Sequence, residues 1–154
     1  MPLAEFNFGT LKYPWDDPRL KDFQDNLDRV NALAQRSDGF IWMLDEDGMD
    51  AVQNDPQGPL KDRPNTASTL SVWRDAQSLW QFVENTLHGR FMKRGSEWFR
   101  ADDRSHLVIW EVVEGHRPTV AEGMARWEDL MRDGPSKPIF GGAELRRRSD
   151  VSAS

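Results

Sequence analysis

The sequence predicts an α+β fold in which an antiparallel sheet carries helices on one face. Short apolar or β-branched runs alternate with amphipathic patterns in the order strand, helix, strand, strand, helix, strand, and a further helix and a short strand follow. This order is typical of a ferredoxin-like sandwich. We expect a single domain over residues 1–145 and a disordered C-terminal tail over 146–154, where arginine and small polar residues predominate.

The first half of the pattern contains four segments. They are a strand over 4–11, a helix from Pro18 to Ala34, a short apolar strand over 40–44 and a polar segment over 45–65. Pro18 suits the first helical position, and the apolar residues after it recur at steps of three and four. Because 45–65 is rich in proline and has little hydrophobic periodicity, we expect a long loop or an extended hairpin connection.

The second half adds three helices and three strands. They are a strand over 69–73, a helix capped by Asp75, a short helix around 91–99, a strand over 107–113, a helix from Thr119 to Met131 and an edge strand at 139–140. The helix start at Thr119 is the most specific local signal, because Thr119 and Glu122 have the spacing of a capping box.

Alternation along the strands divides their residues into two sets. One set is apolar and is expected to form a core face: Ala4, Phe6, Phe8, Ile41, Met43, Leu70, Val72, Leu107 and Ile109. The other mixes three tryptophans with small polar groups and is expected to line a pocket or a subunit interface: Glu5, Asn7, Trp42, Thr69, Ser71, Trp73, Val108 and Trp110. This division assumes that each set stays together across the sheet.

Composition excludes several classes of function. The net charge of −6, with both signs interspersed, gives no electrostatic footprint for nucleic acid. No apolar run approaches the roughly 20 residues that span a bilayer, so we expect a cytoplasmic protein without a membrane partner. The absence of cysteine removes disulfides, thiol nucleophiles and cysteine-bound metals. No dinucleotide, phosphate-loop or zinc-protease motif occurs, so we expect no cofactor.

Two residues are the candidates for catalysis. His88 follows the apolar face of a helix and stands beside Gly89, so its imidazole can serve as a base or as a ligand to a metal or haem iron. Asn7 can donate to a developing oxyanion or to bound dioxygen. The structural alternatives are a buried histidine bonded to a carbonyl group and an asparagine at a sheet edge or against a partner subunit.

Six further residues are candidates for substrate binding: Trp42, Trp73, Trp110, Thr69, Ser71 and Arg90. The tryptophans can wall a cavity for a flat aromatic ligand, but a core or a dimer interface explains them equally well. Arg90 can meet an acidic substrate, although basic residues near a helix end are usually solvated. Glu5 and Glu111 are proton acceptors if they are buried, and salt bridges are their simpler explanation.

Several blocks of the sequence together resemble a known family. They are A-E-F-N-F, D-D-P-R-L, G-F-I-W, L-S-V-W, L-H-G-R-F-M-K-R-G-S-E-W-F, G-H-R-P-T-V-A-E and D-G-P-S. The chain resembles the family named domain of unknown function 3291, which is placed among the dimeric α+β barrel proteins. The resemblance implies a homodimer in which two ferredoxin-like subunits pack their sheets into a shared barrel, but it implies no reaction. Met43 stands where the family usually has a basic residue, and Thr69 where it commonly has asparagine.

Three functions remain open. The leading hypothesis is a small-molecule enzyme that works by cofactor-independent oxygenation or proton transfer on an aromatic or polycyclic substrate. The second is a non-catalytic dimeric binding or structural protein. The third is haem binding, because Asn7, Trp80 and His88 are similar to the asparagine, tryptophan and histidine of haem-degrading monooxygenases in the wider superfamily.

Overall fold

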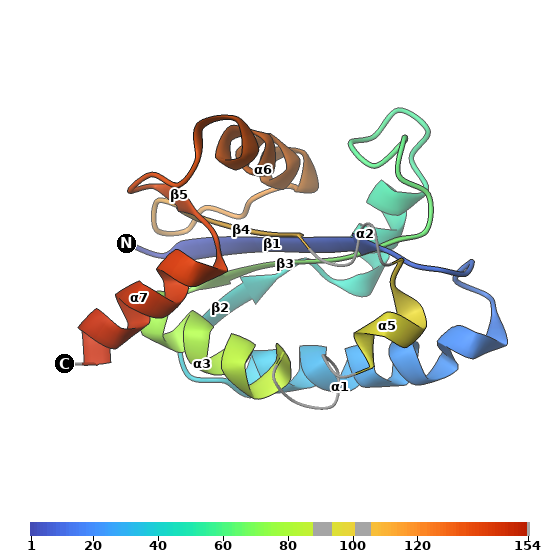
Figure 1. The fold of residues 1–154 in the computed structure, drawn as a ribbon, viewed down its shortest axis with the longest axis horizontal. Helices are drawn as coiled ribbons and strands as arrows, with labels where there is room; N and C mark the ends of the chain where they lie inside the picture. Colours follow the sequence, from blue (N-terminus) through green and yellow to red (C-terminus); the bar gives the residue numbers. More distant parts are fainter. Residues whose placement is uncertain (88–93, 101–105, 154) are drawn as a thin grey trace.

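A five-stranded antiparallel sheet forms the centre of the protein (Figure 1). The computed structural model describes residues 1–87, 94–100 and 106–153. The strands are β1 (Leu3–Thr10), β2 (Phe40–Met43), β3 (Thr66–Trp73), β4 (His106–Glu111) and β5 (Ile139–Phe140). Their order across the sheet is β2-β3-β1-β4-β5, so β1 is central and β2 and β5 form the edges.

Helices cover both faces of this sheet. Their bounds are α1 (Lys21–Arg36, after a 3-10 turn at Pro18–Leu20), α2 (Glu46–Gln53), α3 (Ala76–Leu87), α5 (Gly95–Trp98), α6 (Val120–Asp133) and α7 (Gly142–Ala153). The two helices of the ferredoxin-like core, α1 and α3, lie on one face as predicted, whereas α6 lies on the other (Figure 1). The predicted α+β class and antiparallel sheet are confirmed. None of the helices in the part of the chain that the structure describes is long and apolar enough to span a membrane.

Two expectations about irregular segments were wrong. Part of the segment expected to be a loop forms α2, because the Asp45 carboxylate accepts a hydrogen bond from the N–H of Gly48 and caps the helix. Met49 and Val52 then pack against the core. The expected disordered tail is helical through α7, which Leu145 anchors with a fully buried side chain. Leu145 is a single large apolar residue in a charged segment and is therefore a weak signal for a helix in the sequence. Its burial holds α7 against α3.

The register of β4 overturns the predicted division of side chains. Asn7 lies opposite Leu107, and Phe6 lies opposite Val108. Because directly opposed residues share a face, the apolar Leu107 joins the polar set of β1. Val108 and Trp110 join Phe6 instead, since Ala4 lies opposite Trp110.

A register shift moves Trp42 as well. The pairing of β2 with β3 is irregular between Phe40 and Trp42, and Trp42 lies opposite Val72. Trp42 therefore packs with the apolar cluster of the α6 face, while Phe40 packs with Trp73 on the opposite side. Alternation within one strand is visible in a sequence, but the register that joins neighbouring strands is not.

The face of the sheet that carries α6 is closed by the chain itself. Phe6, Phe8 and Leu70 are fully buried there, under Leu60, α6 and the apolar side of α2. Gly123 permits the close approach of α6, because a Cβ atom at this position would lie 2.7 Å from Cγ of Phe6. In the barrel that the family resemblance implies, this face would meet a second sheet, whereas Leu60 and side chains of α2 and α6 pack against it here.

Candidate functional site

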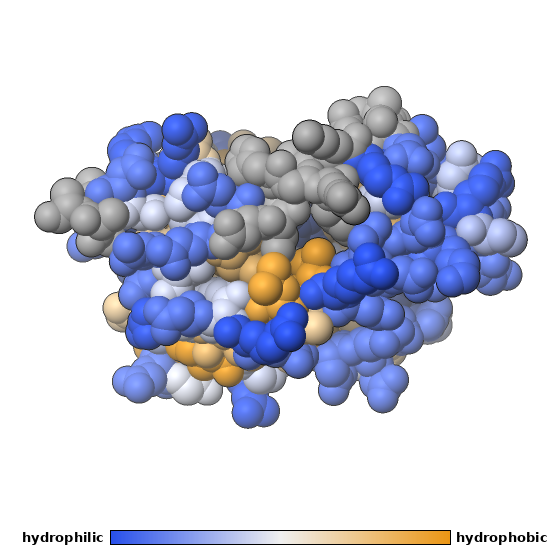
Figure 2. Space-filling view, turned by 90° about the horizontal axis from the view of Figure 1, so that it is seen from below, coloured by the Kyte–Doolittle hydropathy of each residue, from blue (hydrophilic) through white to orange (hydrophobic). Residues whose placement is uncertain are grey.

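A small apolar cavity lies between the sheet and the helices α1 and α3. Its volume is about 80 Å³. Since one buried water needs about 10–15 Å³, the cavity has room for several waters or a small organic group. Most of its wall comes from β1, β3, α1 and α3, with single residues from β2, β4 and the segment after α5. The wall residues are Glu5, Asn7, Phe23, Leu27, Val30, Asn31, Ala34, Met43, Ala67, Ser68, Thr69, Ser71, Leu79, Phe82, Val83, Phe99 and Leu107. Figure 2 shows this side of the molecule, with apolar surface gathered in the middle of largely hydrophilic surroundings.

Glu5 is the single acidic residue in the described walls of this cavity. It is only 6% exposed, and no lysine, arginine or histidine is found in the described walls. Burial raises the pKa of the Glu5 carboxyl from 4.5 to about 7, because desolvation disfavours the charged form, while hydrogen bonds from Ser71 and Thr69 oppose the rise. The carboxyl group therefore changes its charge near neutral pH.

A chain of hydrogen bonds holds Glu5 in place. The Ser71 hydroxyl donates to Oε1 of Glu5 at 2.7 Å, and Nε1 of Trp73 donates to the Ser71 hydroxyl at 2.9 Å. The Thr69 hydroxyl lies 3.3 Å from Oε1 and 3.5 Å from Oε2. One hydroxyl has one proton, so Oε2 has no donor of its own among these contacts. The indole fixes the direction of the Ser71 proton and so orients the carboxyl group.

A second, larger cavity opens next to the first. Its volume is about 300 Å³, and it shares five wall residues with the Glu5 cavity: Leu27, Asn31, Met43, Ser68 and Thr69. Four carboxylates line it, namely Asp28 from α1 and Asp45, Glu46 and Asp50 at α2. We call this space the acidic vestibule. No basic residue occurs in its described wall.

The structure brings three of the predicted site residues together and separates the rest. Asn7, Thr69 and Ser71 line the Glu5 cavity. Trp73 is fully buried and is absent from the described cavity wall, but its indole donates to Ser71 and its ring stacks on Phe82, which are both wall residues. His88 and Arg90 lie outside the described residues, so their roles remain predictions.

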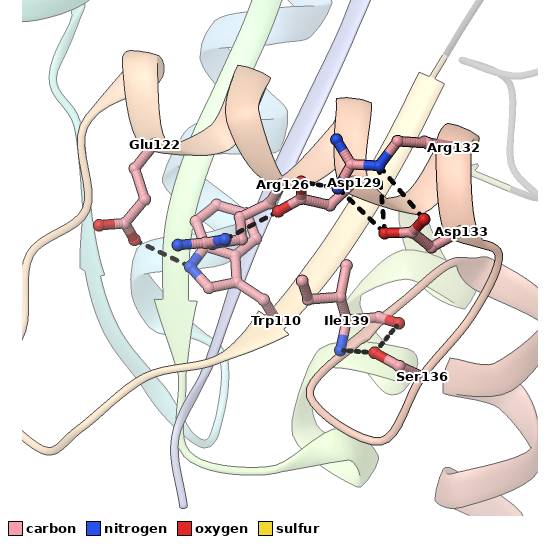
Figure 3. A network of polar contacts seen from close by, with 8 residues as sticks. All are labelled: Trp110, Glu122, Arg126, Asp129, Arg132, Asp133, Ser136 and Ile139. Atoms are coloured by element: carbon pink, nitrogen blue, oxygen red, sulfur yellow. Dashed lines mark hydrogen bonds and ion pairs between the residues drawn. The ribbon is translucent and has the colours of Figure 1, made fainter.

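Trp42 and Trp110 lie on the other face of the sheet. Trp42 packs against the apolar cluster there, and Arg117 approaches its ring to 5.9 Å. Nε1 of Trp110 donates to Oε2 of Glu122 at 2.8 Å, which ties β4 to α6 (Figure 3). Trp42 and Trp110 therefore do not share a wall with Asn7, because the register of β2 and β4 places both rings with the apolar cluster on the other face.

The described residues bring together only part of the haem hypothesis. Of its three residues, Asn7 lines the cavity, Trp80 is half-buried against the α3 cluster and is absent from the described cavity wall, and His88 is not described. Haem binding therefore stays a prediction. No group of three or more potential metal ligands occurs among residues 1–87, 94–100 and 106–153.

The most informative residues were those to which sequence reasoning gave least weight. For Glu5, a salt bridge was the simpler explanation and a role as proton acceptor was the alternative if the residue is buried, which it is; Asn31 was not considered. Asn31 is half-buried where the two cavities join, and its amide makes no hydrogen bond with another described residue. Its place on the apolar side of an amphipathic helix, four residues after Leu27, is a signal that could have identified it.

The fold and the cavity together define an α+β sandwich with an internal, largely apolar cavity. The family model described as "Domain of unknown function (DUF3291)" matches residues 2–153, so the chain belongs to this family. The two departures from the family pattern, Met43 and Thr69, both lie in the wall shared by the Glu5 cavity and the acidic vestibule.

Solved structures give more distant similarities. The cofactor-independent oxygenase SnoaB from Streptomyces nogalater is 16% identical, with a TM-score of 0.40 over 79% of this chain and 98% of that one. A protein of unknown function from Nitrosomonas europaea is 14% identical, with a TM-score of 0.44 over 77% of this chain and 95% of that one. No protein of curated function matches the sequence. None of these comparisons assigns an activity to this chain.

Proposed function

We propose that this protein is a small-molecule enzyme in which Glu5 takes a proton from a small apolar or aromatic substrate and returns it. The observation that carries the proposal is a carboxyl group buried in an otherwise apolar cavity, with its pKa raised to about 7. Groups with perturbed pKa values in cavities are candidates for catalysis. A general base is most effective when its pKa lies near the working pH.

The neighbours of Glu5 suit this chemistry. Ser71 holds Oε1, so Oε2 is the atom that accepts the substrate proton. Asn7 and Thr69 line the same cavity and can donate hydrogen bonds to the oxygen on which negative charge develops. In the oxygenase form of the proposal, dioxygen is a co-substrate that adds to the deprotonated carbon, and the resulting peroxide anion takes back a proton. This form needs no flavin or nicotinamide.

Proton exchange tests the proposal without knowledge of the natural substrate. Phenylacetone in D2O should exchange its acidic C–H protons faster with the protein than with buffer alone, as measured by NMR. The Glu5→Gln variant should lose at least 90% of the added rate, as expected when a general base that contributes about 10²–10⁴-fold is removed. The added rate should rise with pH around 7. Loss of oxygen from solution, followed with an electrode, tests the oxygenase form.

Glu128→Gln is the matched control, because it makes the same chemical change on the exposed side of α6. It should exchange as the wild type does. Equal exchange by wild type and Glu5→Gln would contradict the role of Glu5. His88→Ala is measured in the same assay. If this variant loses proton exchange while Glu5→Gln keeps it, the base is His88 and not Glu5.

A binding protein without catalysis is the second candidate. The observation in its favour is that Ser71 and Thr69 already bond to Glu5, which is what a purely structural carboxyl group requires. In this case a ligand binds in calorimetry, Glu5→Gln changes its affinity, and no proton exchanges in either protein.

The homodimer is part of both candidates. The side chains of the sheet face that carries α6 are already buried, so a second copy would contact the outer surface of α6 and its surroundings rather than the strands. Met131 on α6 and Val113 after β4 are both large, apolar and exposed. Light scattering should give twice the monomer mass of 17.8 kDa, and Met131→Glu together with Val113→Glu should return it to the monomer value.

A further inference from the structure

We infer that the Glu5 cavity and the acidic vestibule form one binding site for an organic cation, with an apolar group in the inner cavity and a positive charge in the vestibule. The inference rests on the proposed function and adds the class of substrate. Because the two spaces share five wall residues, one molecule can occupy both. Their joint volume lies near the lower end of the roughly 300–1,000 Å³ that is usual for ligand sites.

The charge of the ligand follows from the carboxylates of the vestibule. Asp28, Glu46 and Asp50 are exposed and make no ion pair with any residue in the described ranges. Asp45 is engaged in capping α2. The described wall therefore holds negative charge that no described residue neutralises, and the field of several like charges adds up there.

Two groups inside the site can contact such a ligand. The carboxyl group of Glu5 is more than nine-tenths buried, accepts hydrogen bonds from Ser71 and Thr69, and has no basic neighbour in the described cavity wall, so a cation nearby favours its charged form. Asn31 presents an amide with both donor and acceptor atoms where the two cavities join, and nothing among the described residues bonds to it. A hydrogen bond from an ammonium group to the Asn31 carbonyl oxygen would satisfy that acceptor.

Met43 decides whether the vestibule keeps its negative charge. Its thioether lies in the shared wall and is neutral, so it leaves the carboxylates uncompensated. A lysine at this position would bring a positive charge to the point where the two cavities meet. The preference of the site for cations should therefore depend on one position.

The experiment uses three probes of similar size and different charge. They are 2-phenylethylamine, 2-phenylethanol and 3-phenylpropionate, titrated into the full chain by calorimetry at pH 7.5 and low salt. The amine should bind best, and its advantage over the carboxylate should shrink as salt is added. Asp28→Asn together with Asp50→Asn should weaken amine binding about threefold to tenfold and leave the alcohol unchanged, since exposed charge pairs contribute little each.

Two matched variants make the test specific. Met43→Lys should reverse the order of amine and carboxylate, whereas Met43→Leu, which keeps the volume, should preserve it. Glu114→Gln together with Glu128→Gln removes two exposed charges elsewhere and should leave all three affinities unchanged.

Failure of this inference is distinguishable from failure of the proposed function. Equal binding of amine and carboxylate, with proton exchange that still depends on Glu5, would overturn the cation preference and leave the catalytic proposal intact. Binding of the amine without any Glu5-dependent proton exchange would support the cation site and contradict the proposed proton transfer. No binding of any of the three probes would overturn this inference.

Discussion

The two faces of the sheet differ in what fills them. On the α6 face, Phe6, Phe8 and Leu70 are fully buried in a continuous apolar cluster. On the α1 and α3 face, a cavity remains, and a carboxyl group stands in it. Close packing is the rule inside proteins, so a cavity with a buried ionisable group is the exception that calls for an explanation. The α6 face stabilises the fold, and the opposite face carries the site.

Small residues create this difference. Ala67, Ser68, Thr69 and Ser71 on β3 and Ala34 on α1 line the cavity, and none of them reaches far enough to close the gap between sheet and helix. On the α6 face, Gly123 lets the helix backbone approach Phe6, and the large rings then fill the remaining space. The small residues of β3 and α1 thus leave space between the sheet and the helices. Gly123 has the opposite effect, because it lets the backbone of α6 come close to the sheet.

The largest expected effect comes from removing a ring on the α6 face. Phe6→Ala should lower the free energy of unfolding by about 4 kcal/mol, because it opens a void in a closed cluster. Leu27→Ala, in the wall of the existing cavity and half-buried, should lower it by about 1–2 kcal/mol. Urea unfolding measures both. Equal losses of unfolding free energy in the two variants would show that the two faces are packed equally well.

The next effect is a pH dependence caused by Glu5. Below about pH 4.5 the carboxyl is protonated in both the folded and the unfolded chain. Between 4.5 and 7 the folded state keeps a proton that the unfolded chain has lost, so the free energy of unfolding falls as the pH rises. Above about 7 the loss is complete, at about 3 kcal/mol.

Glu5→Gln should lack that part of the pH dependence. Unfolding of wild type and variant by urea at pH 5 and pH 8 isolates the contribution, since every other group is shared. The wild type should lose stability relative to the variant over this range. A constant difference at the two pH values would mean that the pKa of Glu5 is not raised.

A smaller effect tests the close approach of α6. Gly123→Ala should lower the free energy of unfolding by about 1–3 kcal/mol, because the added methyl group forces Phe6 or the helix to move. Gly142→Ala at the start of α7 is the control, since its Cβ atom would meet Leu107 at an ordinary 3.7 Å. The control should be neutral or stabilising. Thermal unfolding followed by circular dichroism compares the two.

The smallest effect concerns the hydrogen bond from Ser71 to Glu5 in the cavity. Ser71→Ala removes the 2.7 Å hydrogen bond that opposes the rise of the Glu5 pKa, so this pKa should rise further. Ser68→Ala alters the same cavity wall without touching Glu5, because the Ser68 hydroxyl donates to the sulfur of Met49. It should leave the pKa unchanged. NMR titration of the labelled Glu5 carboxyl follows both.

Much of the fold could be predicted because its signals are local. The proline at the start of the α1 region and the capping box at Thr119 each fix an element with residues a few positions apart. The cap of α2 at Asp45 was equally local, but the polar composition of 45–65 obscured it. Helix α7 depends on the burial of Leu145 against residues that are distant in the sequence. The sequence of the helix alone does not predict these contacts.

The site was predictable only in part, because it depends on relations between strands. Asn7, Thr69 and Ser71 were grouped correctly, since β1 and β3 pair without a shift. Trp42 and Trp110 were grouped with them wrongly, because a bulge in β2 and the register of β4 reverse their faces. The burial of Glu5 follows from helices that are remote in sequence, so its raised pKa could not be inferred from composition.

The central position of β1 has an evolutionary consequence. Along this strand, Ala4, Phe6 and Phe8 belong to the closed cluster, while Glu5 and Asn7 face the cavity. Substitutions at positions 5 and 7 can therefore change the chemistry of the cavity while the residues that secure the fold stay the same. One strand in this arrangement separates the residues that stabilise the protein from those that a lineage is free to vary.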